Sequence, residues 1–499
     1  MLHAVVDVGT TSIKAGIVSD EDYRIVDKTS IPARVIHPKS GFAEQDPDAL
    51  FQSVLGLLKD VCDGYEVKSI ALTTHMAGFV PVDREGKELC NLIIWLDERG
   101  KGYPRKLFSG LLKIEGYNAL ELLRFLRATG GAPSRTGKDV LSKILWLREN
   151  EPDIFSRTWK FLDVKGYLLF RLTGNAVMSH DEANLTWLAD TRKKRAEWHD
   201  GLMKRHGLGS ELFPEIRSST DIAGKVLPEI RKEIGLKGDV PVLVGSGDMC
   251  TSAIGSGAVK SDEIHIYIGT SDWIAAHVDR RMADVRHYVG TILSGIPGKY
   301  LLVAEQEVAG GAIDWVSYNF GISDHRKMDD IAMETETDLI FTPWFYGERA
   351  VIDDHHIRGS LVNLSLSTRK EEVVRAAFEG VALNIAWAFE IVEKFVKANR
   401  ITAVGGGARY DSLCKIMADA LQKRIERIAE PEDAGLRGLA VISSVGLKRE
   451  SFEDAVKKFR VERVFEPDRE MEGYYARKLE IFREYYRKTR GIFRKLNVL

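Results

Sequence analysis

Val5-Val6-Asp7-Val8-Gly9-Thr10-Thr11-Ser12-Ile13-Lys14-Ala15-Gly16-Ile17 decides the fold, because a β-branched run leads directly into a Gly-Thr turn. The pattern recurs about half a chain later as Ile266-Tyr267-Ile268-Gly269-Thr270-Ser271-Asp272. Either loop alone is better explained as an ordinary β-hairpin turn, since short motifs match by accident. Two such loops, each after a strand-like run, predict duplicated halves that close on a nucleotide.

The residues of the first turn have chemistry that suits a phosphate group. Glycine lets the backbone approach phosphate closely, and neighbouring hydroxyl and amide groups donate hydrogen bonds to its oxygens. Asp7 can hold Mg²⁺ through water, and Lys14 adds a positive charge nearby. We therefore expect the Asp7 carboxylate to organise Mg²⁺ rather than to touch a second substrate.

Length and charge balance set the broad class of the protein. A chain of 499 residues exceeds the usual size of a single core, so two domains of roughly 250 residues are expected. The 71 Lys and Arg residues nearly balance the 73 Asp and Glu residues. The formal charge of −2 gives no reason to expect nucleic acid or an anionic membrane as partner, so the expected substrate is a small molecule.

The cysteines and the N-terminus indicate the compartment. Four cysteines lie far apart without a CxxC pair, which predicts a reduced protein with neither disulfide nor zinc. The chain enters strand residues at once, without a basic leader, and no stretch reaches the ~18 apolar residues that span a bilayer. The sequence therefore predicts a soluble, cytoplasmic protein.

The first third of the chain alternates strand-like and helical runs, as is typical of an α/β domain. Strands are predicted at residues 4–17, 67–73 and 92–95, and helices at residues 48–61 and 118–128.

The middle of the chain predicts an insert followed by a domain boundary. Apolar residues between Leu141 and Leu172, interrupted by Glu151-Pro152, predict packed helices rather than sheet, as in a lid or insert. Pro241-Val242-Leu243-Val244 has the composition of a strand, and a Gly-rich segment follows from Gly245 to Gly257. We therefore place the boundary between residues 244 and 245.

The second half repeats the order of strand, phosphate turn and helices. Residues 371–396 predict a long buried helix that leads through strand 401–404 into Gly405-Gly406-Gly407, another turn compatible with phosphate. The helix predicted at residues 474–499 is basic near its end. Given the nearly neutral chain, a solvated helix face explains it better than nucleic-acid binding.

Together these motifs resemble the FGGY family of carbohydrate kinases, and their order and spacing over nearly the whole chain make the resemblance specific. In order, the matching pieces are Asp7-Val8-Gly9-Thr10-Thr11, Gly41-Phe42-Ala43-Glu44-Gln45-Asp46-Pro47, Ile94-Trp95-Leu96-Asp97-Glu98-Arg99, Tyr167-Leu168-Leu169-Phe170-Arg171-Leu172-Thr173-Gly174, Gly245-Ser246-Gly247-Asp248, Gly269-Thr270-Ser271, Gly347-Glu348-Arg349, Arg358-Gly359-Ser360 and Gly405-Gly406-Gly407-Ala408-Arg409. Within the family the chain looks most like the xylulose kinases, through Phe341-Thr342-Pro343 and Ala376-Ala377-Phe378-Glu379-Gly380-Val381-Ala382.

The resemblance implies an α/β fold of two actin-like (ribonuclease H-like) domains with the active site in the cleft between them. Residues 1–244 would form the sugar-binding domain with its helical insert, and residues 245–499 the nucleotide-binding domain. The implied activity is transfer of the ATP γ-phosphoryl group to a hydroxyl of a small sugar or polyol, with Mg²⁺ as cofactor. A homodimer is compatible with this assignment.

Phosphoryl transfer needs a carboxylate to accept the hydroxyl proton, and Asp248 matches the catalytic aspartate of the family. The alternative for Asp248 is a cap on the helix predicted to begin near Met249, and both roles can coexist.

The resemblance also assigns the residues that bind ATP. They are Thr10, Thr11 and Lys14 in one loop, Gly269, Thr270 and Ser271 in the other, Gly310 and Gly311 at a further contact, and Gly406, Gly407 and Ala408 on the adenosine side. Close helix packing explains Gly310-Gly311 equally well. Dinucleotide and Walker-type sites are excluded, because neither G-x-G-x-x-G after a strand nor GxxxxGK[ST] occurs.

The acceptor side departs from the family pattern. Many xylulose kinases carry Gln-Met-His-Gly where this chain has His75-Met76-Ala77-Gly78, so Ala77 occupies the position of the sugar-contacting histidine. In a strand-like segment His75 would share the face of Ala77 and could substitute for it, although a structural histidine is an equal alternative. His75, Met76, Trp95, Asp97 and Asp248 are the predicted acceptor-binding residues.

Two acidic features have ordinary explanations. Asp272 follows the second loop and either acts through Mg²⁺ or, as is favoured, caps a turn. The run Asp353-Asp354-His355-His356 is better explained as a solvated loop than as a metal site. For the whole chain, the alternatives to a kinase are an actin-like or chaperone-like ATPase and a catalytically silent sugar sensor. Asp7, Asp248 and the Trp95-Asp97-Arg99 segment favour the kinase.

Overall fold

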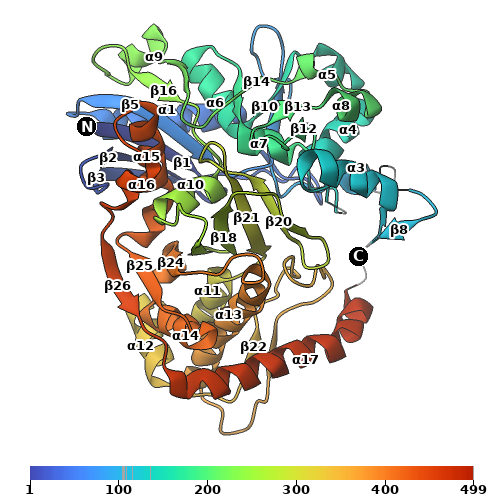
Figure 1. Ribbon diagram of the computed structural model, residues 1–499, viewed down its shortest axis with the longest axis vertical. Helices are drawn as coiled ribbons and strands as arrows, with labels where there is room; N and C mark the ends of the chain where they lie inside the picture. The colour runs from blue at the N-terminus through green and yellow to red at the C-terminus, as the bar shows by residue number, and fades with distance from the viewer. Residues whose placement is uncertain (104–106, 108, 115, 135, 498–499) are drawn as a thin grey trace.

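Two mixed β-sheets, one in each half of the chain, form the framework of the computed structural model (Figure 1). The structure describes all residues except 104–106, 108, 115, 135, 498 and 499. The six strands of the first sheet are, in spatial order, β15 (Ile222–Lys225), β16 (Pro241–Leu243), β5 (Val67–Thr74), β1 (Leu2–Val8), β2 (Ser12–Ser19) and β3 (Ile25–Pro32). The eight strands of the second are β19 (Ala283–Asp284), β20 (Val289–Leu293), β21 (Tyr300–Gln306), β18 (Asp272–Val278), β17 (Glu263–Ile268), β24 (Arg400–Val404), β25 (Ile425–Ile428) and β26 (Val461–Phe465).

The first sheet is built around β1, which pairs antiparallel with β2 and parallel with β5. Its run Ala4-Val5-Val6 is completely buried because side chains on both faces of the strand are covered. Helix α1 (Pro47–Cys62) packs against this sheet, and its first turn is closed by the side chain of Asp46. The strand predicted at residues 67–73 and the helix predicted at residues 48–61 are confirmed to within one residue at each end.

A helical insert interrupts the first sheet between β5 and β15, and most of it lies at the upper right of Figure 1. It contains α3 (Ala119–Thr129), α4 (Val140–Asn150), α5 (Pro152–Arg157), α6 (Val164–Thr173), α7 (His180–Leu185) and α8 (Asp200–Arg205). The expectation of helices alone between residues 141 and 172 is wrong at β10 (Lys160–Asp163), which pairs antiparallel with β6 (Phe79–Val82). The apolar pair Phe161-Leu162 is buried on both faces of that strand, a pattern that periodicity alone does not distinguish from a helix.

The second sheet is covered by the long helix α13 (Lys370–Val392), as the sequence predicts, together with α11 (Gly310–Asn319), α14 (Asp411–Leu421) and α12 (His325–Glu334). The final helix α17 (Glu472–Leu496) buries Leu479, Phe482 and Tyr486 against this domain. The basic side chains toward its end are exposed, namely those of Arg487, Lys488, Arg490, Arg494 and Lys495, whereas Lys478 is buried. Within the described ranges, no helix is long and apolar enough to cross a membrane.

Two helices join the halves of the molecule and lie side by side in Figure 1: α10 (Asp248–Gly255) and α15 (Ala434–Gly446). Their contact has no room for side chains at two glycines. A Cβ built on Gly255 would collide with the carbonyl oxygen of Ala434, and one built on Gly438 would collide with that of Thr251. Because α15 is buried on all sides, it also packs against β5, β1 and β2 of the first sheet. The helix pair therefore fixes one domain against the other.

We expect Gly438→Ala to lower the free energy of unfolding by about 1–3 kcal/mol, because the added methyl group forces the two helices apart. Gly56→Ala in α1 is the matched control. No atom lies within 4 Å of its added Cβ, so this substitution should stabilise the protein by about 0.5–1 kcal/mol. Chemical denaturation of the three proteins measures both effects. Equal stability of Gly438→Ala and wild type would contradict the tight contact.

Candidate active site

The two Gly-Thr loops are both β-hairpin turns, one between β1 and β2 and the other between β17 and β18. The Gly9 amide donates to the Ser12 carbonyl at 2.9 Å, and the Gly269 amide donates to the Ser271 carbonyl at 2.8 Å. Each turn presents an exposed threonine, Thr11 or Thr270, at its tip. The hairpin interpretation and the phosphate-loop interpretation therefore describe the same geometry.

Asp7 and Asp248 lie 241 residues apart in the sequence, and the charge of Asp7 acts on Asp248. Burial raises the pKa of Asp248 to about 8, with a further increase from Asp7, against a hydrogen bond from the Met249 amide at 2.8 Å. Burial also raises the pKa of Asp7 to about 6, while Lys14 lowers it and Asp433 raises it again. The structure therefore brings together the predicted base and the predicted metal-binding residue.

Asp248 is the first residue of α10, and Gly247 is the N-cap residue, so the side chain of Asp248 does not cap this helix. The segment before it is held by Asp181 of α7, whose Oδ2 accepts from the Ser246 hydroxyl at 2.7 Å and from the Gly247 amide at 2.6 Å. Sequence reasoning missed Asp181, because its partners lie far away along the chain.

Asp7 faces the N-terminus of α15, where a Cβ added to Gly435 would lie 2.9 Å from Asp7 Oδ2. Lys14 Nζ donates to the Glu432 carbonyl at 3.1 Å and lies 4.0 Å from Asp433 Oδ1. The raised pKa values of Asp7 and Asp248 show two carboxyl groups without full cationic compensation. Carboxylate oxygens are the donors that Mg²⁺ prefers, so these residues fit a magnesium ion.

The remaining nucleotide residues lie around the second loop. The amides of Gly310 and Gly311 donate to the carbonyls of Gly269 and Thr270 at 2.9 and 3.1 Å, so the start of α11 supports this loop from behind. Gly310 and Gly311 therefore pack closely, as the alternative interpretation of the sequence predicts. Whether Gly310 and Gly311 also contact ATP stays a prediction.

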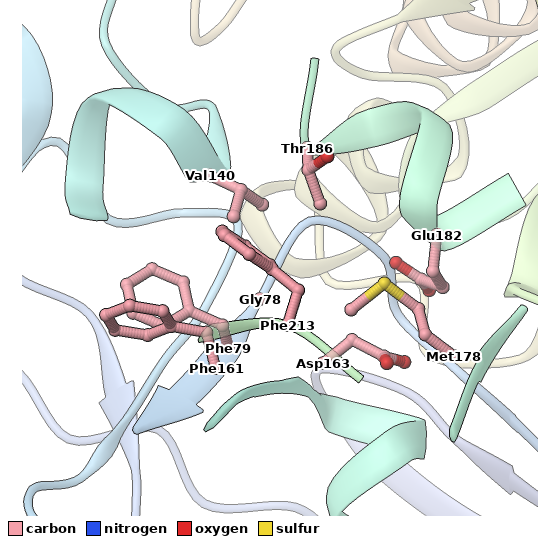
Figure 2. Close-up of a pocket in the computed structure, with 9 residues that line it drawn as sticks. All are labelled: Gly78, Phe79, Val140, Phe161, Asp163, Met178, Glu182, Thr186 and Phe213. Atoms are coloured by element: carbon pink, nitrogen blue, oxygen red, sulfur yellow. The ribbon is translucent and has the colours of Figure 1, made fainter. Parts of the chain in front are cut away.

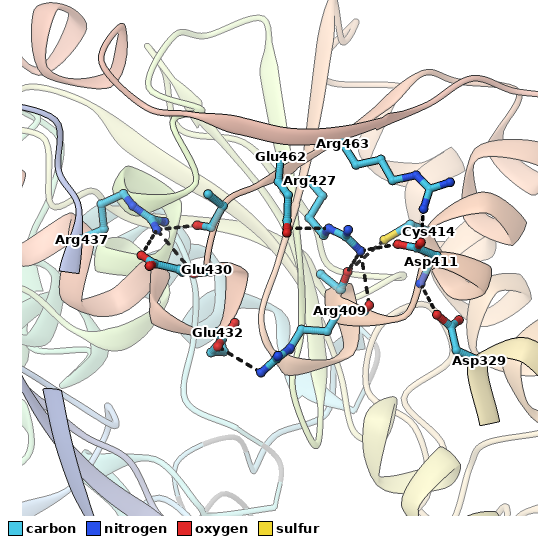
Figure 3. Close-up of polar contacts among 12 residues, drawn as sticks. Asp329, Arg409, Asp411, Cys414, Arg427, Glu430, Glu432, Arg437, Glu462 and Arg463 are labelled. Carbon is cyan, nitrogen blue, oxygen red and sulfur yellow. Dashed lines mark hydrogen bonds and ion pairs between the residues drawn. The ribbon is translucent and has the colours of Figure 1, made fainter. Parts of the chain in front are cut away.

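Gly406, Gly407 and Ala408 form a short 3-10 turn after β24, in which Gly406 is exposed and the other two are buried. Arg427 holds this turn (Figure 3): its Nη1 donates to the Ala408 carbonyl at 3.2 Å and to Asp411 Oδ1 at 2.6 Å. The turn that the sequence assigns to adenosine is thus fixed by a buried cation.

The acceptor segment, His75 to Gly78, does not continue the strand. β5 ends at Thr74, and Ala77 has a left-handed backbone with φ of 58°. The expectation that His75 shares the face of Ala77 is therefore wrong, because it assumed strand geometry. His75 is buried, and its Nε2 shares a hydrogen bond with Gln45 Oε1 at 3.0 Å.

The segment around Trp95 connects the acceptor side with the first loop. Trp95 Nε1 donates to Thr10 Oγ1 at 2.9 Å. Asp97 is completely buried, and its two oxygens accept from Arg99 Nε and from the Ala43 amide, each at 2.8 Å. These contacts give Asp97 a positioning function, and its direct contact with an acceptor stays a prediction.

Lys143 on α4 is a residue that sequence reasoning missed, although a lysine on an apolar helix face was a signal. Its side chain is completely buried, and Nζ donates to the carbonyls of Ile94 at 2.7 Å and Ala77 at 3.2 Å. Burial lowers its pKa to about 7, against the influence of Asp97 and Asp139. Lys143 therefore ties the acceptor segment to the turn that carries Trp95, which follows the short strand β7 (Leu92–Ile93).

A cavity of about 10 Å³ borders Gly78 of the acceptor segment (Figure 2). Asp163 and Glu182 also line it, and in the described part of the chain Asp163 Oδ1 and Glu182 Oε1 have no hydrogen-bond partner. This volume holds one water molecule and not a sugar, so the acceptor does not bind here.

Asp272 opens β18 opposite Gln306 of β21 and does not cap a turn through its side chain, because neither carboxyl oxygen has a hydrogen-bond partner among the described residues. Burial raises its pKa well above the ordinary value, and the carboxylates of Glu348 and Glu305 raise it further. The run Asp353-Asp354-His355-His356 forms no metal site, since no group of three or more His, Cys, Asp or Glu residues outside the gaps is arranged to hold an ion.

Comparison with known proteins identifies related sequences over nearly the full length. The model of the FGGY family of carbohydrate kinases, N-terminal domain, matches residues 2–255, and that of the C-terminal domain matches residues 265–447. The xylulose kinase of Lactococcus lactis subsp. lactis is 28% identical over 505 residues, covering 98% of this chain and 97% of the relative. The gluconokinase of Bacillus subtilis is 27% identical, covering 84% of this chain and 83% of the relative. The crystal structure of gluconate kinase from Lactobacillus acidophilus covers 100% of both chains with a TM-score of 0.88 at 24% identity, which shows a common fold.

We expect Lys143→Met to raise the KM for the acceptor at least about 10-fold while the KM for ATP changes little, because it leaves two carbonyls around the acceptor segment without their donor. Lys59→Met, at an exposed position of α1, is the control and should leave both constants unchanged. Steady-state kinetics with each substrate varied in turn separates the two constants. An equal rise in both would contradict a specific link to the acceptor segment.

Asp272→Asn tests the pH dependence of stability. The folded protein keeps the Asp272 proton at pH values where the unfolded chain, with an ordinary pKa of 3.8, has released it. Wild type is therefore expected to lose stability as pH rises above about 4, and Asp272→Asn should lose less. Unfolding midpoints at several pH values between 4 and 8 measure the difference, with exposed Asp60→Asn as control. A pH-independent gap between wild type and Asp272→Asn would disprove the burial of this proton.

Proposed function

The chain belongs to the FGGY family of carbohydrate kinases, and we propose that its acceptor is a xylulose-like ketose. Family membership makes the protein a kinase that transfers the γ-phosphoryl group of ATP to a hydroxyl of a small sugar or polyol, and it favours this activity over an actin-like or chaperone-like ATPase. The relatives at 28% and 27% identity are named for xylulose and for gluconate. The ketose is supported by the higher identity and greater coverage of the xylulose kinase. Ala77 replaces the histidine that contacts the sugar in many xylulose kinases, so a sugar acid, as the name of the gluconokinase indicates, is the second candidate.

The observation that carries the proposed site is that two buried carboxyl groups, Asp7 and Asp248, are close enough for the charge of Asp7 to act on Asp248, in a structure with two phosphate-type loops. Asp248 Oδ accepts the proton of the attacking hydroxyl, and burial, which raises the pKa of Asp248, makes its carboxylate a stronger base. Thr10, Thr11, Thr270 and Ser271 donate hydrogen bonds to phosphate oxygens. Asp7 would hold Mg²⁺, which would neutralise phosphate charge when bound.

Three further predictions from the sequence stay proposals. We place the domain boundary between residues 244 and 245, just after β16. We also propose that the protein acts in the cytoplasm and that it forms a homodimer.

A panel of ketopentoses, ketohexoses, polyols and sugar acids tests the acceptor. With ATP and Mg²⁺ present, the correct acceptor should raise ADP release well above the background seen with ATP alone, because its binding completes the catalytic geometry. The largest stimulation by a sugar acid would replace the ketose proposal.

The same panel with Asp248→Asn tests the base. We expect turnover to fall by roughly 10²-fold or more while ATP affinity stays nearly unchanged, since the amide cannot accept the hydroxyl proton. Calorimetric titration with ATP provides the control for folding and nucleotide binding. Near-normal turnover of Asp248→Asn would remove Asp248 from this function.

A further inference from the structure

Tyr267 is the counterpart of Asp7 in the internal repeat. Asp7 lies two residues before Gly9 at the end of β1, and Tyr267 lies two residues before Gly269 at the end of β17. In each half, this residue is the second-last residue of the strand that leads into a phosphate-type loop. The nucleotide and base assignments give Tyr267 no function.

The ring of Tyr267 is held in one orientation by its neighbour across the hairpin. Tyr267 pairs with Trp273 in the β17–β18 register, and the two rings stack with centroids 3.9 Å apart and planes 5° from parallel. Trp273 is itself fixed, since its Nε1 donates to His265 Nε2 at 3.1 Å. It is buried in a cluster that includes Met76 of the acceptor segment and Cys250 of α10. The stack is therefore a rigid support that reaches from the second sheet to the acceptor side.

The hydroxyl of Tyr267 lies at the second phosphate-type loop. A Cβ built on Gly269 would lie 3.1 Å from Tyr267 Oη and 2.7 Å from Cε1. Tyr267 is only half-buried, and across the described ranges its hydroxyl has no protein hydrogen-bond partner. A tyrosine whose ring is packed normally places its hydroxyl on a partner, so this donor is available to a ligand.

The two carboxyl groups of the proposed site, Asp7 and Asp248, act electrostatically on the Tyr267 hydroxyl. Burial raises the pKa of Tyr267, and Asp7 and Asp248 raise it further, in that order. The phenol therefore stays protonated at neutral pH and can only donate to an anionic ligand. The hydroxyl therefore lies beside the second phosphate-type loop and within electrostatic reach of both carboxylates.

We propose that Tyr267 is a further catalytic residue, whose hydroxyl donates a hydrogen bond to an oxygen of the transferring phosphoryl group. The inference rests on the proposed kinase function and on the site at Asp7 and Asp248. Stacking on Trp273 orients the hydroxyl in advance, so no reorganisation is needed during transfer. No proton leaves Tyr267, and no bond to it forms or breaks.

Tyr267→Phe is the test, because it removes one oxygen atom and keeps the stacked ring. We expect kcat with the best acceptor to fall roughly 10-fold or more, as for loss of a hydrogen bond to a charged group, while the KM of the acceptor stays within about two-fold. Exposed Tyr318→Phe on α11 is the matched control and should keep wild-type kinetics. An unchanged unfolding temperature verifies that the stack has survived.

A binding experiment separates this inference from the proposed function, because it needs no acceptor. Calorimetry with Mg²⁺ and AMP-PNP, which carries a γ-phosphoryl group, is compared with Mg²⁺ and ADP, which lacks one. Tyr267→Phe should weaken AMP-PNP binding roughly 10-fold and leave ADP binding unchanged. Equal weakening of both nucleotides, or wild-type affinity and kcat, would overturn the inference. If no acceptor is found but AMP-PNP binding alone weakens, the hydroxyl assignment stands and the acceptor proposal fails.

Discussion

The contact between α10 and α15 is the constraint on which the site depends. Glycines at Gly255 and Gly438 let the two helices approach until backbone meets backbone, and residues of both helices join a buried cluster with the first sheet. The helix that begins at Asp248 is thereby held against the helix whose N-terminus faces Asp7. Asp248 belongs to α10 and Asp7 to β1, so a shift of α10 relative to the first sheet would move Asp248 relative to Asp7. Packing of the helix pair against the sheet therefore sets the geometry of the site.

The site concentrates carboxyl groups in a place where their charge is unfavourable. Asp7 and Asp248 both have raised pKa values, chiefly through burial. A protein gains nothing in stability from such an arrangement, which is typical of functional sites where a ligand later supplies the compensating charge. The surrounding supports are all fixed: Asp181 holds the segment before Asp248, and Lys143 holds the acceptor segment. Rigid supports around an electrostatically unsatisfied centre are consistent with catalysis by preorganised groups.

Sequence reasoning succeeded where a pattern is local. The strand at residues 67–73, the helix at residues 48–61 and the long helix near residues 371–396 follow from periodicity and from turn residues next to them. It failed at β10, where a short apolar run is buried on both faces, and at His75, where the strand had already ended. It also overlooked α15, although the apolar run between Leu436 and Val445 is a signal for a helix buried on all sides.

The sequence by itself determined the duplicated Gly-Thr loops, the α/β class and the kinase family, because these depend on residue types at fixed short spacings. Only the tertiary structure decided that the charge of Asp7 acts on Asp248, that Lys143 reaches two carbonyls of the acceptor side, and that Tyr267 stacks on Trp273 beside the second loop. The physical reason is that these contacts depend on burial and on the approach of distant segments. Their strength is set by the packing of the domains, which no local spacing records.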